Sequence, residues 1–550
     1  MIKPVAILFL LIVTGVSFAK PGPTFEEKVD MTPWGDQVAV FTEGRVKSYE
    51  TFARSFMPFI MGSKQFEGQE ATFTYLDMML RPERYVDQDI IFVKHKSLRA
   101  SIAGEIDANP TSTRHRLAMF MKTGLISREL LQTPAVQTLL NRLRQDNRRF
   151  AVPIETIDTA IGASDPRSLW NSLKIVPPIS GHAGDTWNTL DTIENKEIVD
   201  AWQRMVAAWQ SGDAGATNVE LTTLAKLIPA LGADIESYPK AGKLKLESLY
   251  FRLGNLTWIW LIYLVSIVLL LMAFVYRFKI VGRVGMSFFI VALMLNTLAV
   301  IWRWYVSGRY PNTNMFESIT TAAWMGGLFA TLMELYLRKT AMKYLFPLGA
   351  AVAAMVALLA VRLYPLELNP HISNKMPVLH DVWLYIHVNF IIFSYCLIFV
   401  AAVTASLYLI RRVIQRIRGI DCLQDYAKAG GAASLFEKGN GGGSALSNNT
   451  GAVLDGATMI LVELAFILLW TGIVMGAIWA DHSWGRPWGW DPKEVFALNT
   501  FLIFVVLIHT RLKVKDKGFW TAWLALIGCA VMIFNWVIIN FTISGLHSYA

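Results

Sequence analysis

The chain has 550 residues, of which 54% are apolar, and its mean hydropathy is +0.39. A soluble protein of this length is rarely so apolar, so the composition predicts a membrane protein with more than one structural unit. The formal net charge of +9 does not indicate a nucleic-acid partner, because much of the basic charge lies in short loops beside apolar segments. The three cysteines, Cys396, Cys422 and Cys529, form no C-x-x-C pair, which excludes a thioredoxin-like redox motif and a zinc knuckle.

Residues 1–19 have the pattern of an export signal. Lys3 gives a short positive start, an apolar stretch follows, and Ser17-Phe18-Ala19 is a small-x-small cleavage site. An uncleaved anchor helix remains the alternative, because the apolar stretch is long for a signal. Either interpretation places the following segment outside the cytoplasm.

Residues 20–250 are predicted to form a soluble, mostly helical domain outside the cytoplasm. The apolar spacing of "AVQTLLNRLRQDNRRF" and "EIVDAWQRMVAAWQ" is helical, and "QVAVFTEGRVKSYE" predicts two extended pieces joined by a turn at Gly44. His95, His115 and His182 are isolated from other reactive groups. We interpret them as ordinary polar residues, because a site needs several converging groups.

Residues 251–550 contain apolar runs long enough to span a membrane. Eight runs are predicted, at about 255–276, 284–306, 316–337, 342–363, 382–410, 457–479, 493–511 and 519–541. The fold class is therefore an all-α polytopic membrane protein with about eight transmembrane helices and an N-terminal extracytoplasmic domain. The bias of Lys and Arg in the loops places loops 305–316, 364–381 and 480–492 and the C-terminus outside, in a multi-pass protein of the inner (plasma) membrane.

One outer loop is unusually aromatic: "WADHSWGRPWGWDPKEVF", from Trp479 to Phe496, holds four tryptophans within twelve residues. Asp491 can cap a helix, Pro492 suits its first position, and Glu494 completes a capping box, so the next span is predicted to begin here. We expect the tryptophans before it to form a non-helical shelf. The shelf is either an interfacial aromatic belt or a platform for a flat apolar ligand.

Two histidines are predicted at the same face as this loop. His387 lies near the outer end of the fifth span, and His547 follows the last span. A planar iron macrocycle needs axial imidazoles and aromatic surface around it, so these two residues are candidate iron ligands; unrelated surface histidines are the alternative. His482, within the loop, is a second candidate, whereas His371 and His380 are expected to be solvated.

A further histidine and several arginines have candidate roles. His509 lies about 26 Å along the helix from Pro492, toward the inner side, and is either an inner haem ligand or a plain interfacial residue. No second histidine at that depth is evident in the chain. Arg486, Arg303 and Arg309 lie at or near the outer face and could pair with haem propionates or with lipid headgroups.

Taken together, these motifs carry a family resemblance. "WGRPWGWDPKE" resembles the WWD signature of haem-handling membrane proteins. With "IHTRL", "GLHSYA", "WLYIHV" and "SGRYPNTNMFES" it resembles the CcsA/ResC branch, the membrane half of the System II cytochrome c synthase, over roughly residues 280–550. The N-terminal 230 residues are not part of that resemblance.

The resemblance implies specific roles for residues. His387 and His547 would be the external ligands of haem b, and the WWD loop, residues 479–496, would hold the haem edge. The residues implied in that loop are Trp484, Arg486, Trp488, Trp490 and Asp491. His509 would belong to an inner haem site, with its second ligand from a CcsB/ResB-like membrane partner.

The activity implied is transport of haem across the membrane and its covalent attachment to apocytochrome c, by addition of the two C-x-x-C-H thiols to the haem vinyl groups. Thiol-reducing thioredoxin-like proteins and membrane lipid are further expected partners, and the chain is expected to need the CcsB/ResB-like protein for activity. Two alternatives remain open. One is a haem exporter or chaperone that forms no thioether, and the other is an ion or solute transporter that uses embedded charges.

Overall fold

The computed structural model describes residues 24–63, 65–106, 111–146, 148–178, 187–233, 235, 238–340, 342–365, 367–372, 374, 381–421, 426, 450–539, 543 and 545. The chain forms two compact units, Met1–Ser248 and Leu249–Ala550. His547, Cys422, His182 and His380 lie outside the described residues.

The first unit is mostly helical, and its described residues include three small two-stranded antiparallel sheets. Its helices are α1 (Phe25–Lys28), α2 (Thr32–Gln37), α3 (Tyr49–Met61), α4 (Ala71–Leu80), η1 (Pro82–Tyr85), α5 (Lys96–Glu105), α6 (Thr111–Thr123), α7 (Arg128–Leu131), α8 (Pro134–Asp146), α9 (Arg148–Ala163), α10 (Pro166–Ser172), η2 (Leu190–Thr192), α11 (Lys196–Ser211), α12 (Ala214–Ala230) and the first part of α13 (Ala241–Arg252), which continues into the second unit. Its paired strands are β1 (Ala39–Thr42) with β2 (Arg45–Ser48), β3 (Gln65–Phe66) with β4 (Gln69–Glu70), and β5 (Asp89–Phe92) with β6 (Leu125–Ser127).

Two sequence predictions for this unit are confirmed. The segment around Gly44 is the hairpin β1–β2, and positive φ angles at Glu43 (51°) and Gly44 (73°) make its tight turn. The "EIVDAWQRMVAAWQ" pattern is α11, whose apolar stripe includes the fully buried Trp209. The Trp209 indole N–H donates to the buried Asp77 carboxylate at 2.8 Å, so this core includes a satisfied polar contact.

The second unit is a bundle of long helices. Its elements are η3 (Gly254–Ile259), α14 (Trp260–Tyr276), α15 (Lys279–Ser307), α16 (Met315–Leu337), α17 (Leu345–Leu363), α18 (Val382–Ile417), α20 (Thr450–Trp484), α21 (Pro492–Lys513), α22 (Lys517–Ile533) and the π-helical turn η6 (Phe534–Ile539). Among the residues that the structure describes, seven segments are long and apolar enough to cross a membrane, so the protein is a multi-pass membrane protein.

The eight predicted spans all correspond to helices, but α16 is not among the seven candidates. Its sequence includes Glu317, Glu334 and several Gly and Thr residues, which lower its mean hydropathy. Both glutamates are buried against neighbouring helices. Helix α16 packs against α17 and α18 on one side, whereas Leu332, Leu335 and Tyr336 are exposed.

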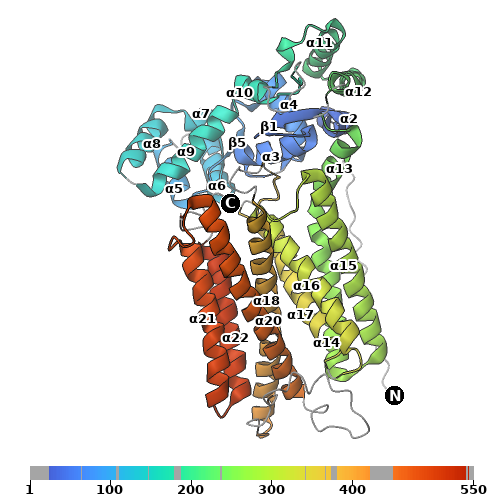
Figure 1. Cartoon of the computed structure of the whole chain (residues 1–550). Coiled ribbons are helices and arrows are strands. Elements are labelled where there is room, and N and C mark those ends of the chain that lie inside the picture. Colours follow the sequence, from blue (N-terminus) through green and yellow to red (C-terminus); the bar gives the residue numbers. More distant parts are fainter. Residues whose placement is uncertain are drawn as a thin grey trace, which may run out of the picture. The chain divides into compact units, whose positions relative to one another are not determined.

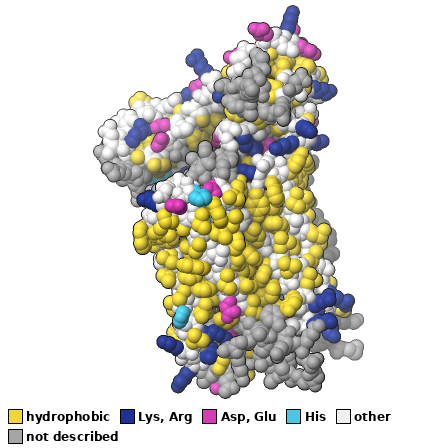
Figure 2. Space-filling view, in the orientation of Figure 1, with side chains coloured by type: hydrophobic (Ala, Val, Ile, Leu, Met, Phe, Trp, Pro, Cys, Tyr) yellow, Lys and Arg dark blue, Asp and Glu magenta, His cyan; other side chains and the backbone are white. Residues whose placement is uncertain are grey.

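Figure 1 shows the bundle helices side by side, with α18 and α20 between the pairs α21–α22 and α16–α17. Exposed apolar side chains cover the face of the bundle that Figure 2 shows, as expected for a surface that faces lipid. Exposed basic residues gather where α14, α16, α18 and α21 end, for example Arg338, Arg416 and Lys513. The aromatic loop and the loop between α15 and α16 lie at the opposite helix ends.

Candidate functional site

A cavity of about 240 Å³ lies at the end of the bundle that carries the aromatic loop. Helices α18 and α20 line it with mostly apolar side chains, and the remaining walls come from the α15–α16 loop, the aromatic loop, the start of α21 and η6. The lining residues used below are Asn312, Thr313, Asn314, Ser318, His387, Tyr395, Gly476, Trp479, Trp488, Lys493, Glu494 and Asn535. A concave apolar site with a few polar groups is typical of ligand binding.

His387 is held in a defined orientation on this cavity wall. Its Nδ1 lies 2.7 Å from the carbonyl oxygen of Gly472 on α20. Because a carbonyl only accepts, Nδ1 carries a proton, and in the neutral form of the ring the lone pair is therefore on Nε2. The ring plane lies within 10° of the Trp479 ring plane. A histidine that donates one ring nitrogen to a carbonyl is the usual arrangement for a metal ligand, so these residues fit an iron-bound imidazole.

Two glycines allow α20 to approach His387 so closely. A Cβ on Gly476 would lie 2.6 Å from Cε1 of His387, and a Cβ on Gly472 would lie 2.6 Å from Cδ1 of Ile391. Real Cβ atoms do not come this close, so any larger residue would push α18 away from α20. The two glycines form a G-x-x-x-G pair, which is typical of close helix contacts in membranes.

The aromatic loop is shorter than predicted. Trp479 and Trp484 lie in the last turns of α20, so the prediction of a non-helical shelf is wrong for these two residues. The helix continues because no breaker precedes Gly485, whose φ of 67° ends it. Trp484 packs edge-on against the buried Trp479, with ring centroids 4.8 Å apart.

The non-helical part of the loop ends in a strained residue and a helix cap. Trp490 has a φ of 55° and is 74% exposed, whereas Trp488 lines the cavity. Asp491 caps α21, and Glu494 accepts from the Asp491 N–H at 3.2 Å and from the Gly489 N–H at 2.9 Å. The predicted capping box is thus confirmed, and it holds the loop in place at the cavity.

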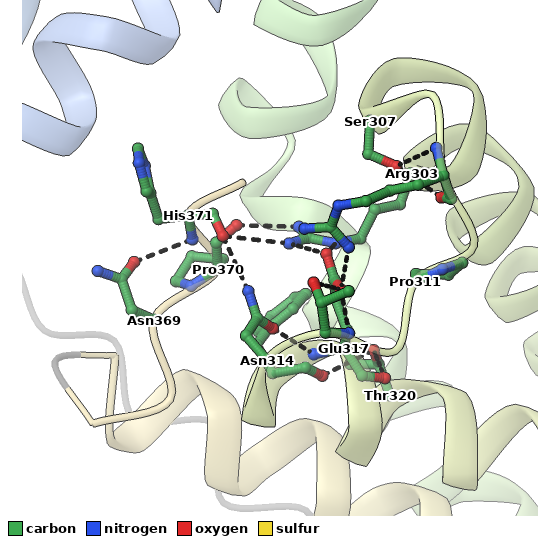
Figure 3. A network of polar contacts seen from close by, with 12 residues as sticks. Arg303, Ser307, Pro311, Asn314, Glu317, Thr320, Asn369, Pro370 and His371 are labelled. Atoms are coloured by element: carbon green, nitrogen blue, oxygen red, sulfur yellow. Dashed lines mark hydrogen bonds and ion pairs between the residues drawn. The ribbon is translucent and has the colours of Figure 1, made fainter. Parts of the chain in front are cut away.

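A buried ion network holds the α15–α16 loop against the cavity (Figure 3). Glu317 is fully buried and pairs with Arg303 and Arg309, each at 2.8 Å. Its carboxylate also accepts from the Thr313 N–H and hydroxyl. Arg303 donates to the carbonyl of Pro370 at 2.9 Å. Arg303 and Arg309 are therefore ion-pair partners of Glu317, and neither the haem propionates nor the lipid headgroups considered from the sequence is needed to account for their charges.

The inner end of the cavity carries a polar pair. Asn535 donates to the Tyr395 hydroxyl at 2.9 Å, and each residue is 5% exposed. Asn535 belongs to the π-helical turn η6, a feature that is frequent at functional sites. Sequence reasoning gave no signal for this pair, because an Asn within an apolar run does not reveal its partner 140 residues earlier.

Comparisons with known proteins identify the family. A family model described as "Cytochrome C assembly protein" matches residues 312–547. The cytochrome c biogenesis protein CcsA of Parasynechococcus marenigrum is 30% identical over 276 residues, which are 49% of this chain and 87% of the relative. The chain belongs to the CcsA family. The CcsA proteins of Guillardia theta (31% over 276 residues, 50% and 87%) and Pyropia yezoensis (30% over 323 residues, 54% and 95%) are similarly related.

Membership of the CcsA family gives the protein a role in cytochrome c biogenesis. The family match begins at Asn312, on the cavity wall, and ends at His547. It therefore includes the aromatic loop and the segments of α18, α20 and α21 that line the cavity. The first unit lies outside the match.

The remaining predicted site residues of this CcsA-family chain lie in different parts of the second unit. Arg486 is exposed in the loop, and His482 lies 3.6 Å from the Asp381 carboxylate. His509 is exposed on α21, where its Nδ1 lies 2.8 Å from the Val505 carbonyl oxygen. The same end of the bundle holds a buried pair between Asp455 and Arg511.

His547 itself lies outside the described residues, but Gly545, two positions earlier, is described. A Cβ on Gly545 would overlap the Asp491 carboxylate and approach Pro492 within 3.1 Å. Gly545 thus lies at the start of α21, next to the aromatic loop. Gly472 and Gly476 were missed in the sequence, although their G-x-x-x-G spacing within an apolar helix is a recognisable signal.

Proposed function

We propose that this chain holds haem b as a substrate in the cavity and positions it for covalent attachment to an apocytochrome c. His387 and His547 ligate the iron, and Trp479, Trp484 and Trp488 shape the apolar surface around the ring. Trp490 and Arg486, which are exposed, contact the incoming polypeptide or the lipid surface rather than the ring interior.

The observation that carries this proposal is the geometry of His387. Its Nδ1–H is directed to Gly472, its ring lies nearly parallel to Trp479, and its side chain lines an apolar cavity. A neutral imidazole that donates its Nδ1–H to a carbonyl has the tautomer that ligation of iron through Nε2 requires. The position of Gly545 beside Asp491 supports His547 as the second ligand, because it brings the chain to the same loop.

The attachment step needs positioning more than acid–base chemistry. Each thiol of the C-x-x-C-H segment adds across one vinyl group. Sulfur bonds to the vinyl carbon next to the ring, and the thiol hydrogen is transferred to the terminal carbon. No group leaves and no oxidant is consumed. Holding the vinyl groups beside the thiols makes the addition effectively intramolecular, which is a large part of what an enzyme can supply.

The proposal assigns the other functions to partners. Haem enters from the cytoplasmic side past His509, whose exposed position on α21 leaves room for a histidine from a CcsB/ResB-like protein. The chain has no C-x-x-C pair, so a separate thioredoxin-like protein keeps the apocytochrome thiols reduced. The aromatic loop lies on the extracytoplasmic side of the inner membrane, where the apocytochrome is delivered.

Co-expression in a host that lacks its own cytochrome c maturation system tests the function. The full chain, a CcsB/ResB-like partner and an apocytochrome with one C-x-x-C-H segment are produced together. We expect haem that stays with the cytochrome in a denaturing gel, and none when His387→Ala replaces the wild type. Haem that co-purifies with the chain but is never attached to the cytochrome would instead support the alternative of a haem exporter or chaperone that forms no thioether.

A further inference from the structure

Helix α18 and the turn η6 both line the inner end of the cavity. His387, Ile391 and Tyr395 line it from α18 at intervals of four residues, so they lie along one stripe of that helix. Asn535 and Trp536 line it from η6. Other elements contribute the polar lining residues Asn314, Ser318 and Lys493. The helix that carries His387 thus meets, at the inner end, the segment that leads to the C-terminus.

A buried hydrogen bond joins these two elements. The Asn535 carboxamide donates to the Tyr395 hydroxyl at 2.9 Å, and the Trp536 ring packs edge-on against the Tyr395 ring with centroids 5.6 Å apart. On the α21 side, the rings of Phe534 and Phe496 are 5.4 Å apart. Apolar contacts are non-directional, whereas a hydrogen bond restricts both distance and angle. The Tyr395–Asn535 bond therefore defines the position of η6 against α18.

The π-helical form of η6 affects the direction of the chain that follows it. A π-turn closes its hydrogen bonds over five residues instead of four, and so holds one residue more than an α-helical turn. One extra residue rotates the following chain by about 100° relative to a regular α-helix. Gly545, ten residues after Asn535, lies beside the Asp491 carboxylate at the aromatic loop. A contact that holds η6 in place therefore also affects where the C-terminal segment lies.

We propose that Tyr395 and Asn535 are positioning residues that set the distance between His387 and the second iron ligand. Tyr395 lies eight residues, or about 12 Å, from His387 along α18. Asn535 belongs to the segment that continues in sequence to His547. This inference rests on the proposed function, in which both histidines ligate the iron, and adds the contact that holds one ligand-bearing segment against the other.

The spin state of bound haem tests this role, because ferric iron with two imidazole ligands is low-spin and ferric iron with one is high-spin. The full chain is purified in detergent, loaded with ferric haem b, and measured by absorption and electron paramagnetic resonance. Tyr395→Phe removes the hydroxyl but keeps the ring. We expect its ratio of low-spin to high-spin haem to fall about fivefold, the effect of one hydrogen bond on an equilibrium. Added imidazole should restore the low-spin form.

A double variant separates positioning from stability. Tyr395→Phe alone leaves the Asn535 amide unpaired at a buried site, so it should also lower the melting temperature. Tyr395→Phe with Asn535→Leu removes both polar groups, and its melting temperature should return close to that of the wild type. Its high-spin fraction should stay raised, because the directional contact is still missing. A low-spin spectrum that recovers together with the melting temperature would overturn the inference.

Thr404→Val is the matched control. Thr404 lies nine residues beyond Tyr395 on α18, and its hydroxyl forms another buried interhelical hydrogen bond, to Thr458 of α20 at 2.8 Å. This variant should lower the melting temperature and keep the wild-type spectrum. An unchanged spectrum in Tyr395→Phe, or an equal high-spin increase in Thr404→Val, would contradict the positioning role.

The same spectra distinguish this inference from the proposed function. High-spin haem in the wild type, or His387→Ala with the haem content and spectrum of the wild type, would contradict ligation by two histidines and this inference with it. Low-spin haem that depends on His387 but not on Tyr395 would contradict only the role of Tyr395 and Asn535.

Discussion

His387 and Gly472 are joined by a hydrogen bond of 2.7 Å between the two longest described helices, α18 and α20. The bond fixes the ring tautomer before any ligand binds. The neighbouring Gly476 supplies the space in which the ring lies. The orientation of one side chain thus depends on how closely two helices pack, and substitutions at either helix should change ligation.

Replacing His387 with Gly should remove the haem ligand while leaving its cavity intact. We expect haem content to fall at least tenfold, because one axial bond is lost. Imidazole added to the growth medium or buffer should restore part of the Soret band by occupying the vacated space. Haem content that equals the wild type without imidazole would disprove the ligand assignment.

Replacing Gly476 with Ala should displace the His387 ring. The new methyl group would lie 2.6 Å from Cε1, so the imidazole must move by several tenths of an ångström or more. We expect a shifted Soret maximum and a changed reduction potential of the bound haem. Overpacking should also lower the free energy of unfolding by about 1–3 kcal/mol.

Gly349→Ala is the matched control for that variant. A Cβ on Gly349 would crowd Val400 of the same helix α18 at 2.7 Å, thirteen residues beyond His387. It should cost a similar amount of stability and leave the haem spectrum unchanged. Identical spectral shifts in both variants would mean that general packing, rather than the position of the ring, controls the spectrum.

The helices of the second unit were predictable from the sequence alone. A helix that spans a membrane needs a long apolar run, and basic residues stay in the loops that water solvates. The sequence also predicted the start of α21, since the Asp491–Glu494 capping box is a local pattern. The exclusion of α16 from the apolar candidates was not anticipated. Its buried Glu317 and Glu334 are tolerated only because neighbouring helices cover them, and that is a tertiary property.

The candidate site was only partly predictable for the same reason. His387 and Trp488 could be named from their positions near span ends, and both line the cavity. Arg303 and Arg309 form ion pairs with Glu317. Tyr395 is hydrogen-bonded to Asn535, which is 140 residues away in the chain. Such pairings depend on which helices are neighbours, and a single sequence does not contain that information.

Changing Glu317 to Gln should destabilise the α15–α16 loop, which forms part of the cavity wall. Arg303 and Arg309 would lose the charge of Glu317 in a buried site, and the removal of one partner of a buried ion pair costs about 3–5 kcal/mol in comparable cases. We expect a lower melting temperature and weaker haem binding. Asp455→Asn, in the buried pair with Arg511 at the other helix ends, should lower the melting temperature but spare haem affinity at His387.

Lys47, in the first unit, should make the stability of its hairpin depend on pH. Burial lowers the pKa of Lys47 to about 8, and the unfolded chain has a value near 10.4. The unfolded state binds more protons between these values, so stability should rise as the pH increases from 8 to about 10.4, by on the order of 3 kcal/mol. Hydrogen exchange of the β1–β2 amides, corrected for intrinsic rates, should show this rise, and Lys47→Met should remove it.

Trp488 and Trp490 should contribute unequally to haem binding although they are two residues apart. Trp488 lines the cavity, whereas Trp490 is 74% exposed with its ring perpendicular to that of Trp488. Truncation of a buried aromatic contact removes far more binding energy than truncation of an exposed one. Trp488→Ala should therefore weaken haem binding about tenfold or more, and Trp490→Ala should leave the dissociation constant within about twofold. If Trp490→Ala had the larger effect on the Soret titration, the macrocycle would have to lie outside the cavity, against the exposed face of the loop.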